Sequence, residues 1–377
     1  GRVQCVYIDP PFNTGLTFCL RMRVGEQGWR SGKTTLALPA YEDRWPDDAS
    51  FLSMMRQVLT LAHALLSEEG TLFLHIDARM HAQLRLMMDD VFGASNFMNE
   101  IIWAYQTGGR ATSHFSRKHD IILFYRKSPA VYFALENIPL ARGKHRTNHM
   151  RRSVDEQGRA YRSIRSAGKE YRYYDDDPVY PGDVWADVSH LQQKDPQRTG
   201  YDTQKPLKLL ERIVLCATRP GDLVADLCAG SGTTAVAAAL HGRTFLSVDK
   251  AACAVSVARK RLLPYRMTVE MAEMDEASAA TAEASCQTGI GYHEVTLDAY
   301  TLEEDKDALA LSGLDAVDQW SVGYLREGVF VSMADATREK KQPVLSERLD
   351  IPILSGTLAI LILDIFGRRR IYTWPVS

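Results

Sequence analysis

The stretch from Leu223 to Asp249 constrains the fold of this chain more than any other. Its first apolar run, residues 223–225, is typical of a buried strand and ends on Asp226. A glycine-rich turn follows, a helix is expected from Thr233, and a second apolar run at 244–248 ends on Asp249. Strand, acidic residue, glycine turn, helix, strand and acidic residue in this order are typical of a nucleotide-cofactor half-site in an α/β sheet.

The glycine turn itself indicates how a ligand would be held. Gly230 and Gly232 allow close approach of the backbone, and the start of the helix presents unpaired N–H groups. Asp249 is placed to accept hydrogen bonds from ribose hydroxyls. Alone, this pattern would equally admit a dinucleotide, because Ala235 at the third glycine position is a tolerated substitution.

A second feature lies near the start of the chain, at Asp9-Pro10-Pro11-Phe12. It follows Cys5-Val6-Tyr7-Ile8, which predicts a buried strand that delivers a carboxylate and an aromatic ring to its carboxyl end. The prolines remove two N–H donors and leave carbonyl acceptors free. Such a site suits a flat molecule with an exocyclic amino group, such as a nucleobase, although Asp-Pro-Pro is also an ordinary strand-to-loop turn.

The remaining pattern alternates between strands and helices, which argues for an α/β sheet. Residues 13–48 are expected to be loop-like. A helix capped by Asp47 or Ser50 is expected to run to about Glu69. Further helices are expected at 80–91, 207–217 and 251–262, and further strands at 71–76, 101–105 and 121–125.

The character of the sequence changes between residues 128 and 200. From Arg142 to Arg172 there are ten Lys or Arg residues against three acids, interleaved with tyrosines and without clear periodicity. A charge run of this kind is often only a solvated face. Basic residues mixed with aromatic ones in an irregular insert also suit phosphate contacts and base stacking.

Composition places outer limits on the function. The net charge is −2, so any nucleic-acid surface is local, and the six cysteines show no zinc-ligand spacing, which predicts no metal site. No apolar run is long enough to cross a bilayer. Residues 267–290 are expected to be a linker and 291–377 a small β-rich module without chemistry, with a hairpin from 358–365 to 370–374.

Three ordered motifs give the sequence a specific resemblance. Asp9-Pro10-Pro11-Phe12-Asn13-Thr14-Gly15, then Thr203-Gln204-Lys205-Pro206, then the segment from Asp226 to Thr234, resemble the β-class amino DNA methyltransferases. The likeness is greatest to the modification subunits of type III restriction systems and related site-specific adenine methyltransferases, and it runs from residue 1 to about 266. Asp364-Ile365-Phe366-Gly367 adds a fainter similarity.

The resemblance implies an α/β fold: a doubly wound, circularly permuted, Rossmann-like sheet. Residues 1–127 would be its catalytic half, 128–200 an inserted target-recognition region and 201–266 the half that binds S-adenosylmethionine. The catalytic residues would be Asp9, Pro10, Pro11 and Phe12. The cofactor would contact Thr203, Gln204, Lys205, Pro206, Asp226, Cys228, Ala229, Gly230, Ser231, Gly232, Thr233, Thr234 and Asp249. DNA would contact Lys144, Arg146, Arg151 and Arg152.

The implied reaction transfers a methyl group to the N6 amine of a flipped-out adenine in double-stranded DNA, in the bacterial cytoplasm at the nucleoid. Cytosine N4 is the alternative target, and a catalytically weak or inactive DNA-binding subunit is the rival function. A second copy of the chain or a restriction subunit would be a protein partner. Two departures would weaken cofactor binding: Cys228 stands where the family usually has Phe, and the strand that usually precedes the catalytic one does not precede Gly1.

Overall fold

A seven-stranded sheet forms the centre of the computed structural model, which describes residues 1–32, 35–105, 111–140, 150, 152–265, 280–302, 311 and 313–374. Neighbouring β4, β1, β11 and β12 are parallel, whereas β6 is antiparallel to both β4 and β5. The strands are, in spatial order, β10 (Val184–Trp185), β5 (Phe97–Ala104), β6 (His119–Arg126), β4 (Leu66–Ile76), β1 (Val3–Ile8), β11 (Leu223–Asp226) and β12 (Thr244–Ser247).

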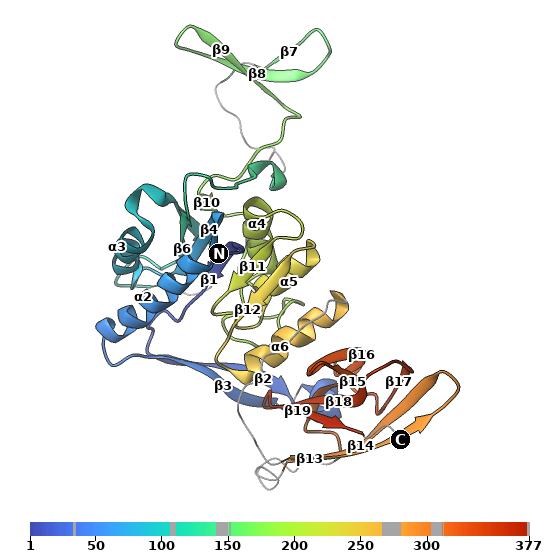
Figure 1. Ribbon diagram of the computed structural model, residues 1–377. Helices are drawn as coiled ribbons and strands as arrows, with labels where there is room; N and C mark the ends of the chain where they lie inside the picture. The colour runs from blue at the N-terminus through green and yellow to red at the C-terminus, as the bar shows by residue number, and fades with distance from the viewer. Residues whose placement is uncertain are drawn as a thin grey trace.

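Helices cover both faces of this sheet, as the doubly wound prediction requires (Figure 1). On one face, α2 (Asp48–Leu65) and α3 (His81–Phe92) share a core with Val6 of β1. On the other, α4 (Leu207–Ala217) and α5 (Thr233–Leu240) share a core with Tyr7 of β1. All six residues of β1 are buried, as expected of a parallel strand that is covered on both faces.

The order of the strands along the chain confirms the circular permutation. β1, with the Asp9 motif behind it, comes first in the sequence, and β11, with the glycine turn, comes after the insert. The two strands are hydrogen-bonded neighbours. Their carboxyl ends therefore meet at one edge of the sheet, where ligands bind in folds of this class.

Two expectations about the first third of the chain are wrong. The helix capped by Asp47, whose carboxylate accepts a hydrogen bond from the Ser50 N–H at 2.7 Å, ends at Leu65 rather than Glu69. Its successor β4 starts at Leu66, because Leu66 pairs with Val3 in extended conformation.

Residues 13–48 are not loop-like. β2 (Leu16–Arg23) and β3 (Thr35–Asp43) form an antiparallel pair, and α1 (Gly25–Ser31) lies between them in the chain. Alternating apolar side chains, among them Leu20, Met22 and Leu38, pack against α6 (Ala252–Leu262) in a small core. The sequence does show this period of two, with Leu20 and Met22 at buried positions and Arg21 and Arg23 between them on the other face.

The insert also has more order than its sequence indicates. β7 (Arg152–Val154), β8 (Ala160–Ser166) and β9 (Lys169–Tyr174) form a separate three-stranded antiparallel sheet that projects from the body of the protein (Figure 1). Tyr161 lies opposite Tyr174 across the strands, with ring centroids 5.6 Å apart. Such cross-strand aromatic pairs stabilise an otherwise exposed sheet.

The described residues after 279 form two antiparallel sheets. One sheet has the order β13 (Ala280–Thr288), β14 (Tyr292–Leu302), β17 (Arg348–Pro352). The other has the order β16 (Val329–Thr337), β15 (Val317–Arg326), β18 (Thr357–Asp364), β19 (Arg369–Thr373). The expected hairpin is present as β18 and β19, but residues 280–288 form a strand instead of a linker, because alternate residues such as Ala282 and Ala284 pack on the core.

Candidate active site

A cavity of about 1020 Å³ lies beyond the carboxyl ends of β1, β11 and β12. The hairpin strand β3 and the turn between β18 and β19 complete its wall. Most residues expected to act on substrate or cofactor line it: Asp9, Pro11, Thr203, Gln204, Lys205, Asp226, Cys228, Ala229, Gly230, Ser231, Thr233, Thr234 and Asp249. Pro10, Phe12, Pro206 and Gly232 are outside this lining.

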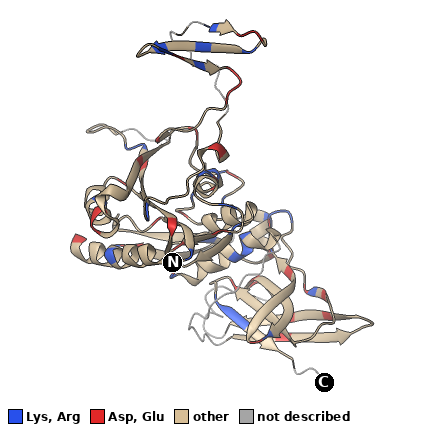
Figure 2. Cartoon of the chain, turned by 45° about the horizontal axis from the view of Figure 1, so that its top comes forward, with Lys and Arg blue, Asp and Glu red and all other residues tan. Residues whose placement is uncertain are grey.

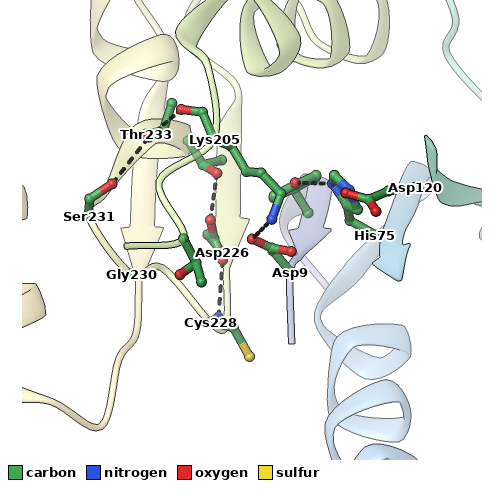
Figure 3. A network of polar contacts seen from close by, with 12 residues as sticks. Asp9, His75, Asp120, Lys205, Asp226, Cys228, Gly230, Ser231 and Thr233 are labelled. Atoms are coloured by element: carbon green, nitrogen blue, oxygen red, sulfur yellow. Dashed lines mark hydrogen bonds and ion pairs between the residues drawn. The ribbon is translucent and has the colours of Figure 1, made fainter. Parts of the chain in front are cut away.

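Asp9 emerges from the end of β1 and forms an ion pair with Lys205 (Figure 3). The Lys205 Nζ lies 2.6 Å from Asp9 Oδ2. Asp9 Oδ1 is buried and has no hydrogen-bond partner among the described residues. A buried carboxylate oxygen without a donor is costly, so this atom is ready to accept a hydrogen bond from a ligand.

Lys205 therefore has a different position from the one expected of a cofactor ligand alone. It lines the cavity, yet its charge is directed at Asp9, and its Nζ also lies 5.4 Å from the centre of the Phe12 ring. Phe12 packs partly against the core, with its ring centroid 6.1 Å from that of His75. The lysine thus connects the two halves of the permuted fold at the reacting edge.

Asp226 is buried, and its hydrogen bonds hold the two ends of the glycine turn. Its carboxylate accepts hydrogen bonds from the Cys228 N–H at 3.0 Å and from the Thr234 hydroxyl. Burial raises the pKa of Asp226 to about 7, although these two hydrogen bonds lower it. Its contacts fix the shape of the turn.

The two glycines of the turn lie against different neighbours, so a side chain at each would meet a different obstacle. Both have left-handed backbone torsions, with φ of 51° at Gly230 and 74° at Gly232. A Cβ on Gly232 would lie 2.5 Å from the Cβ of Ala258, so this residue allows α6 to pack closely. A Cβ on Gly230 would lie 3.3 Å from the Tyr201 ring, at the side of the cavity.

Asp249 follows β12 and binds the backbone of the glycine turn. Its Oδ2 accepts a hydrogen bond from the Gly230 N–H at 2.7 Å, and its Oδ1 accepts one from the Ala251 N–H at 2.9 Å. Burial raises the pKa of Asp249, and these backbone donors lower it. Each carboxylate oxygen has a further lone pair with which it can accept a hydrogen bond from a ligand.

Gln204 fastens the loop that carries Lys205. Its Oε1 accepts hydrogen bonds from the Thr199 N–H and hydroxyl at 2.9 and 2.8 Å, and its Nε2 donates to the Gln197 carbonyl at 2.7 Å. The amide group is therefore engaged by its own loop. The Thr203 Oγ1 accepts a hydrogen bond from the Tyr41 hydroxyl at 3.5 Å.

Arg261 is a residue of the site that the sequence analysis missed. From α6 its Nη1 donates to the Ser231 carbonyl at 2.8 Å and to the Thr233 hydroxyl at 2.9 Å. Burial lowers the pKa of its guanidinium to about 10, which still leaves it charged. No sequence signal could identify it, because one arginine in a helix is ordinary.

A buried polar chain behind Phe12 was also missed. The Tyr7 hydroxyl and His75 Nδ1 are 2.8 Å apart, and His75 Nε2 lies 3.2 Å from Asp120 Oδ2. Tyr105 donates from its hydroxyl to Asp120 Oδ1 at 2.9 Å. Burial alone would raise the pKa of Asp120, but the contacts with His75 and the charge of Lys205 lower it. His75 therefore links Tyr7 of β1 to Asp120 of β6.

The charges of the insert are largely paired. Lys144, Arg146 and Arg151, three of the predicted DNA contacts, lie outside the described residues. The fourth, Arg152, is exposed, and its Nε lies 2.9 Å from Asp175 Oδ2. Figure 2 shows Lys and Arg positions, in blue, spread along the strands of the projecting sheet. In the projecting sheet, Arg162 and Arg172 are also paired with acids, whereas Arg165 and Lys169 form no salt bridge with described residues.

Two classes of feature are absent from the described residues. No group of three or more His, Cys, Asp or Glu residues there could hold a metal ion. None of the helices described is long and apolar enough to span a membrane.

Residues 3–260 match the family model described as DNA methylase, and the chain belongs to this family. It is 26% identical over 306 residues to the type II methyltransferase M.EcaI of Enterobacter cloacae, an alignment that covers 69% of this chain and 64% of that protein. It is 25% identical to the DNA adenine methyltransferase YhdJ of Escherichia coli K12, with coverages of 66% and 71%. It is also 25% identical to the EcoP15I type III Mod subunit of Escherichia coli, with coverages of 56% and 38%.

Proposed function

We propose that this chain transfers a methyl group from S-adenosylmethionine to the N6 amine of an adenine flipped out of double-stranded DNA. The observation that carries the proposal is Asp9 Oδ1, a buried acceptor at the edge of the cavity to which no described residue donates. The choice of adenine over cytosine rests on the Asp-Pro-Pro-Phe motif and on the adenine methyltransferase among the relatives.

The cavity fits an elongated cofactor with a cationic centre and a ribose. Asp9 lines it on the β1 side, and Asp249 lines it beyond β12. Asp249 offers carboxylate oxygens for ribose hydroxyls, while Asp226 and Arg261 shape the turn between them. When bound, the cofactor supplies an electrophilic methyl group on a sulfonium.

The protein's own part in the reaction is to position the target amine. An exocyclic amine is a poor nucleophile because its lone pair is delocalised into the ring. When Asp9 Oδ1 and the carbonyl of Pro10 each accept one N–H, the nitrogen can become pyramidal and present its lone pair. Lys205 holds the other carboxylate oxygen, so the free one keeps a fixed direction. Phe12 offers its ring for stacking on the extruded base.

The projecting sheet β7–β9 supports a DNA partner. It is separate from the catalytic body and carries exposed Tyr171 and Tyr173 beside Arg165 and Lys169. Backbone phosphates and bases are bound by such mixed surfaces. Type III Mod subunits are among the relatives, which favours a second copy or a restriction subunit as an additional partner.

The decisive experiment combines cofactor binding with product analysis. Tritiated methyl transfer to DNA of mixed sequence is measured for the wild type and for Asp9→Ala, and the nucleosides are separated by mass. We expect N6-methyladenine from the wild type and none from the variant, with cofactor affinity retained. N4-methylcytosine would establish the alternative target. Bound DNA without cofactor binding or transfer would establish the non-catalytic subunit.

A further inference from the structure

The turn between β18 and β19 belongs to the wall of the cavity, although it lies more than one hundred residues beyond the family match, which ends at residue 260. Phe366, Gly367, Arg368 and Arg369 all line the cavity. They do so together with residues 249–253, the segment that begins with Asp249 and enters α6. The C-terminal strands thus reach the site from outside the methyltransferase sheet.

Tight packing holds this turn in place against α6. Gly367 has a φ of 82°, and a Cβ there would lie 2.5 Å from the Cys253 backbone nitrogen. Asp364 Oδ1 accepts hydrogen bonds from the N–H groups of Phe366 and Arg368, each at 2.9 Å. The Asp364 contacts fix the shape of the turn, and the close approach of Gly367 fixes its position against α6.

The sheet that carries the turn is itself anchored to α6, through its neighbouring strands β15 and β16. Arg259 donates to Gln319 Oε1 and to the Ser321 hydroxyl, both at 2.6 Å, and lies 3.0 Å from Asp335. Lys260 Nζ lies 2.8 Å from Asp318 Oδ1. These contacts make the turn a fixed wall of the cavity.

The chemistry of the wall matches one end of the proposed cofactor. The reacting methyl group must lie near Asp9, and Asp249 suits the ribose, so the purine extends toward residues 250–253 and the turn. Phe366 offers a ring, and the Arg368 guanidinium carbon lies 4.6 Å from the centre of that ring. An aromatic ring beside a guanidinium is well suited to the face of a purine.

We infer that the C-terminal module supplies part of the cofactor site: Phe366, with Arg368 beside it, binds the adenosine end of S-adenosylmethionine. The inference rests on the proposed function, because it assumes that cofactor. It assigns a ligand to a module whose sequence is expected to carry no chemistry and shows only a faint family similarity at residues 364–367.

Calorimetry on the whole chain tests the inference with S-adenosylmethionine, S-adenosylhomocysteine and adenosine as ligands. Phe366→Leu keeps apolar packing but removes the ring. We expect it to weaken all three ligands by a common factor of roughly ten, since base stacking on an aromatic side chain contributes about 1–3 kcal/mol. Phe330→Leu is the matched control, because Phe330 is half-buried in the same sheet and does not line the cavity.

The outcomes separate this inference from the proposed function. If the wild type binds the cofactor and Phe366→Leu binds it equally well, the module has no part in the site. If the wild type binds none of the three ligands, the proposed function itself fails. Gly367→Ala gives a second measure, because its Cβ would displace the turn, so affinity should fall with it as well. An unchanged melting temperature of free Phe366→Leu shows that its loss of affinity is local.

Discussion

The ion pair between Asp9 and Lys205 joins the end of β1 to the loop before α4, two segments that lie on opposite sides of the insert in the chain. Lys205 lies on the loop before α4, and Gln204 fastens that loop. Oδ2 accepts from Lys205, whereas Oδ1 has no partner among the described residues and is left for a ligand. The lysine is thus best described as a positioning residue, although its motif resembles a cofactor loop.

Lys205→Met tests this description. Loss of the ammonium group releases the carboxylate from its orientation, and misplacement of a reacting group by about 1 Å costs on the order of a hundredfold in rate. We expect kcat for methyl transfer to fall by about that factor, with the cofactor Kd changed less than threefold. Lys250→Met is the control, because Lys250 also lines the cavity but is exposed. A large rise in the cofactor Kd with an unchanged kcat would show instead that Lys205 binds the cofactor.

Asp226 gives a pH-dependent prediction. Its pKa is about 7 in the folded protein, against 3.8 for the free group, so between these values the folded state binds a proton that the unfolded chain lacks. Stability is therefore lost as pH rises from about 4 to 7. Asp226→Asn, whose amide can accept from Cys228 and donate to Thr234, should remove this loss and gain on the order of 4 kcal/mol between pH 4 and pH 8 relative to the wild type.

Urea unfolding at a series of pH values measures this difference. The gain should develop between pH 4 and pH 7 and remain constant above that range. Parallel stability curves for the two proteins would show that the Asp226 carboxyl is ionised in the folded state throughout.

At the scale of elements, the β7–β9 sheet offers the clearest test. Arg165 and Lys169 flank the turn between β8 and β9 and form no salt bridge with described residues, unlike Arg152 and Arg159. Each cation that neutralises a phosphate contributes about 0.9 to the slope of log K against log salt. The double substitution to Gln should therefore lower the slope of DNA binding by roughly two, as measured by fluorescence anisotropy at several salt concentrations.

The control for this double variant removes equal charge elsewhere. Arg56 of α2 and Arg348 of β17 are exposed and paired with Asp90 and Glu294. Their substitution by Gln should leave the slope unchanged. Equal slopes for all three proteins would assign the charges of the insert to a solvated face.

The elements also show what a sequence can predict. The buried parallel strands were predicted well, because β1 and β11 are continuous apolar runs that end on acids. The strands of the insert were not, because an exposed sheet buries little apolar area and its residues are polar and charged. The sequence motifs located Asp9, Asp226 and Asp249, but contacts such as that of Arg261 with the turn depend on how distant segments pack.

At the scale of the whole molecule, Arg259 joins the sheet of the C-terminal module to the methyltransferase half. Burial lowers its pKa, and it is satisfied by Gln319, Ser321 and Asp335. Arg259→Leu would leave these polar groups without their donor. Because such a loss from a buried pair costs about 3 kcal/mol, we expect a decrease of that size in the free energy of unfolding, measured in urea.

Arg348→Leu is the matched variant for Arg259→Leu, because its partner Glu294 lies on the same module and the arginine side chain is 63% exposed. It should change stability by less than about 1 kcal/mol. If both variants behave alike, the module is not held to α6 by Arg259.

The position of β1 in the sheet has a consequence for synthesis. Residues 3–8 form β1, between β4 and β11 in the sheet. Of these two neighbours, β11 (residues 223–226) is synthesised later. At about 5–20 residues per second, on the order of ten to forty seconds pass between the emergence of β1 and that of β11. Through that interval one edge of β1 has no strand beside it, and the apolar side chains that α4 later covers face solvent. We expect the nascent chain to depend on holding chaperones during this time, and the catalytic loop to take its final shape only when the cofactor half arrives.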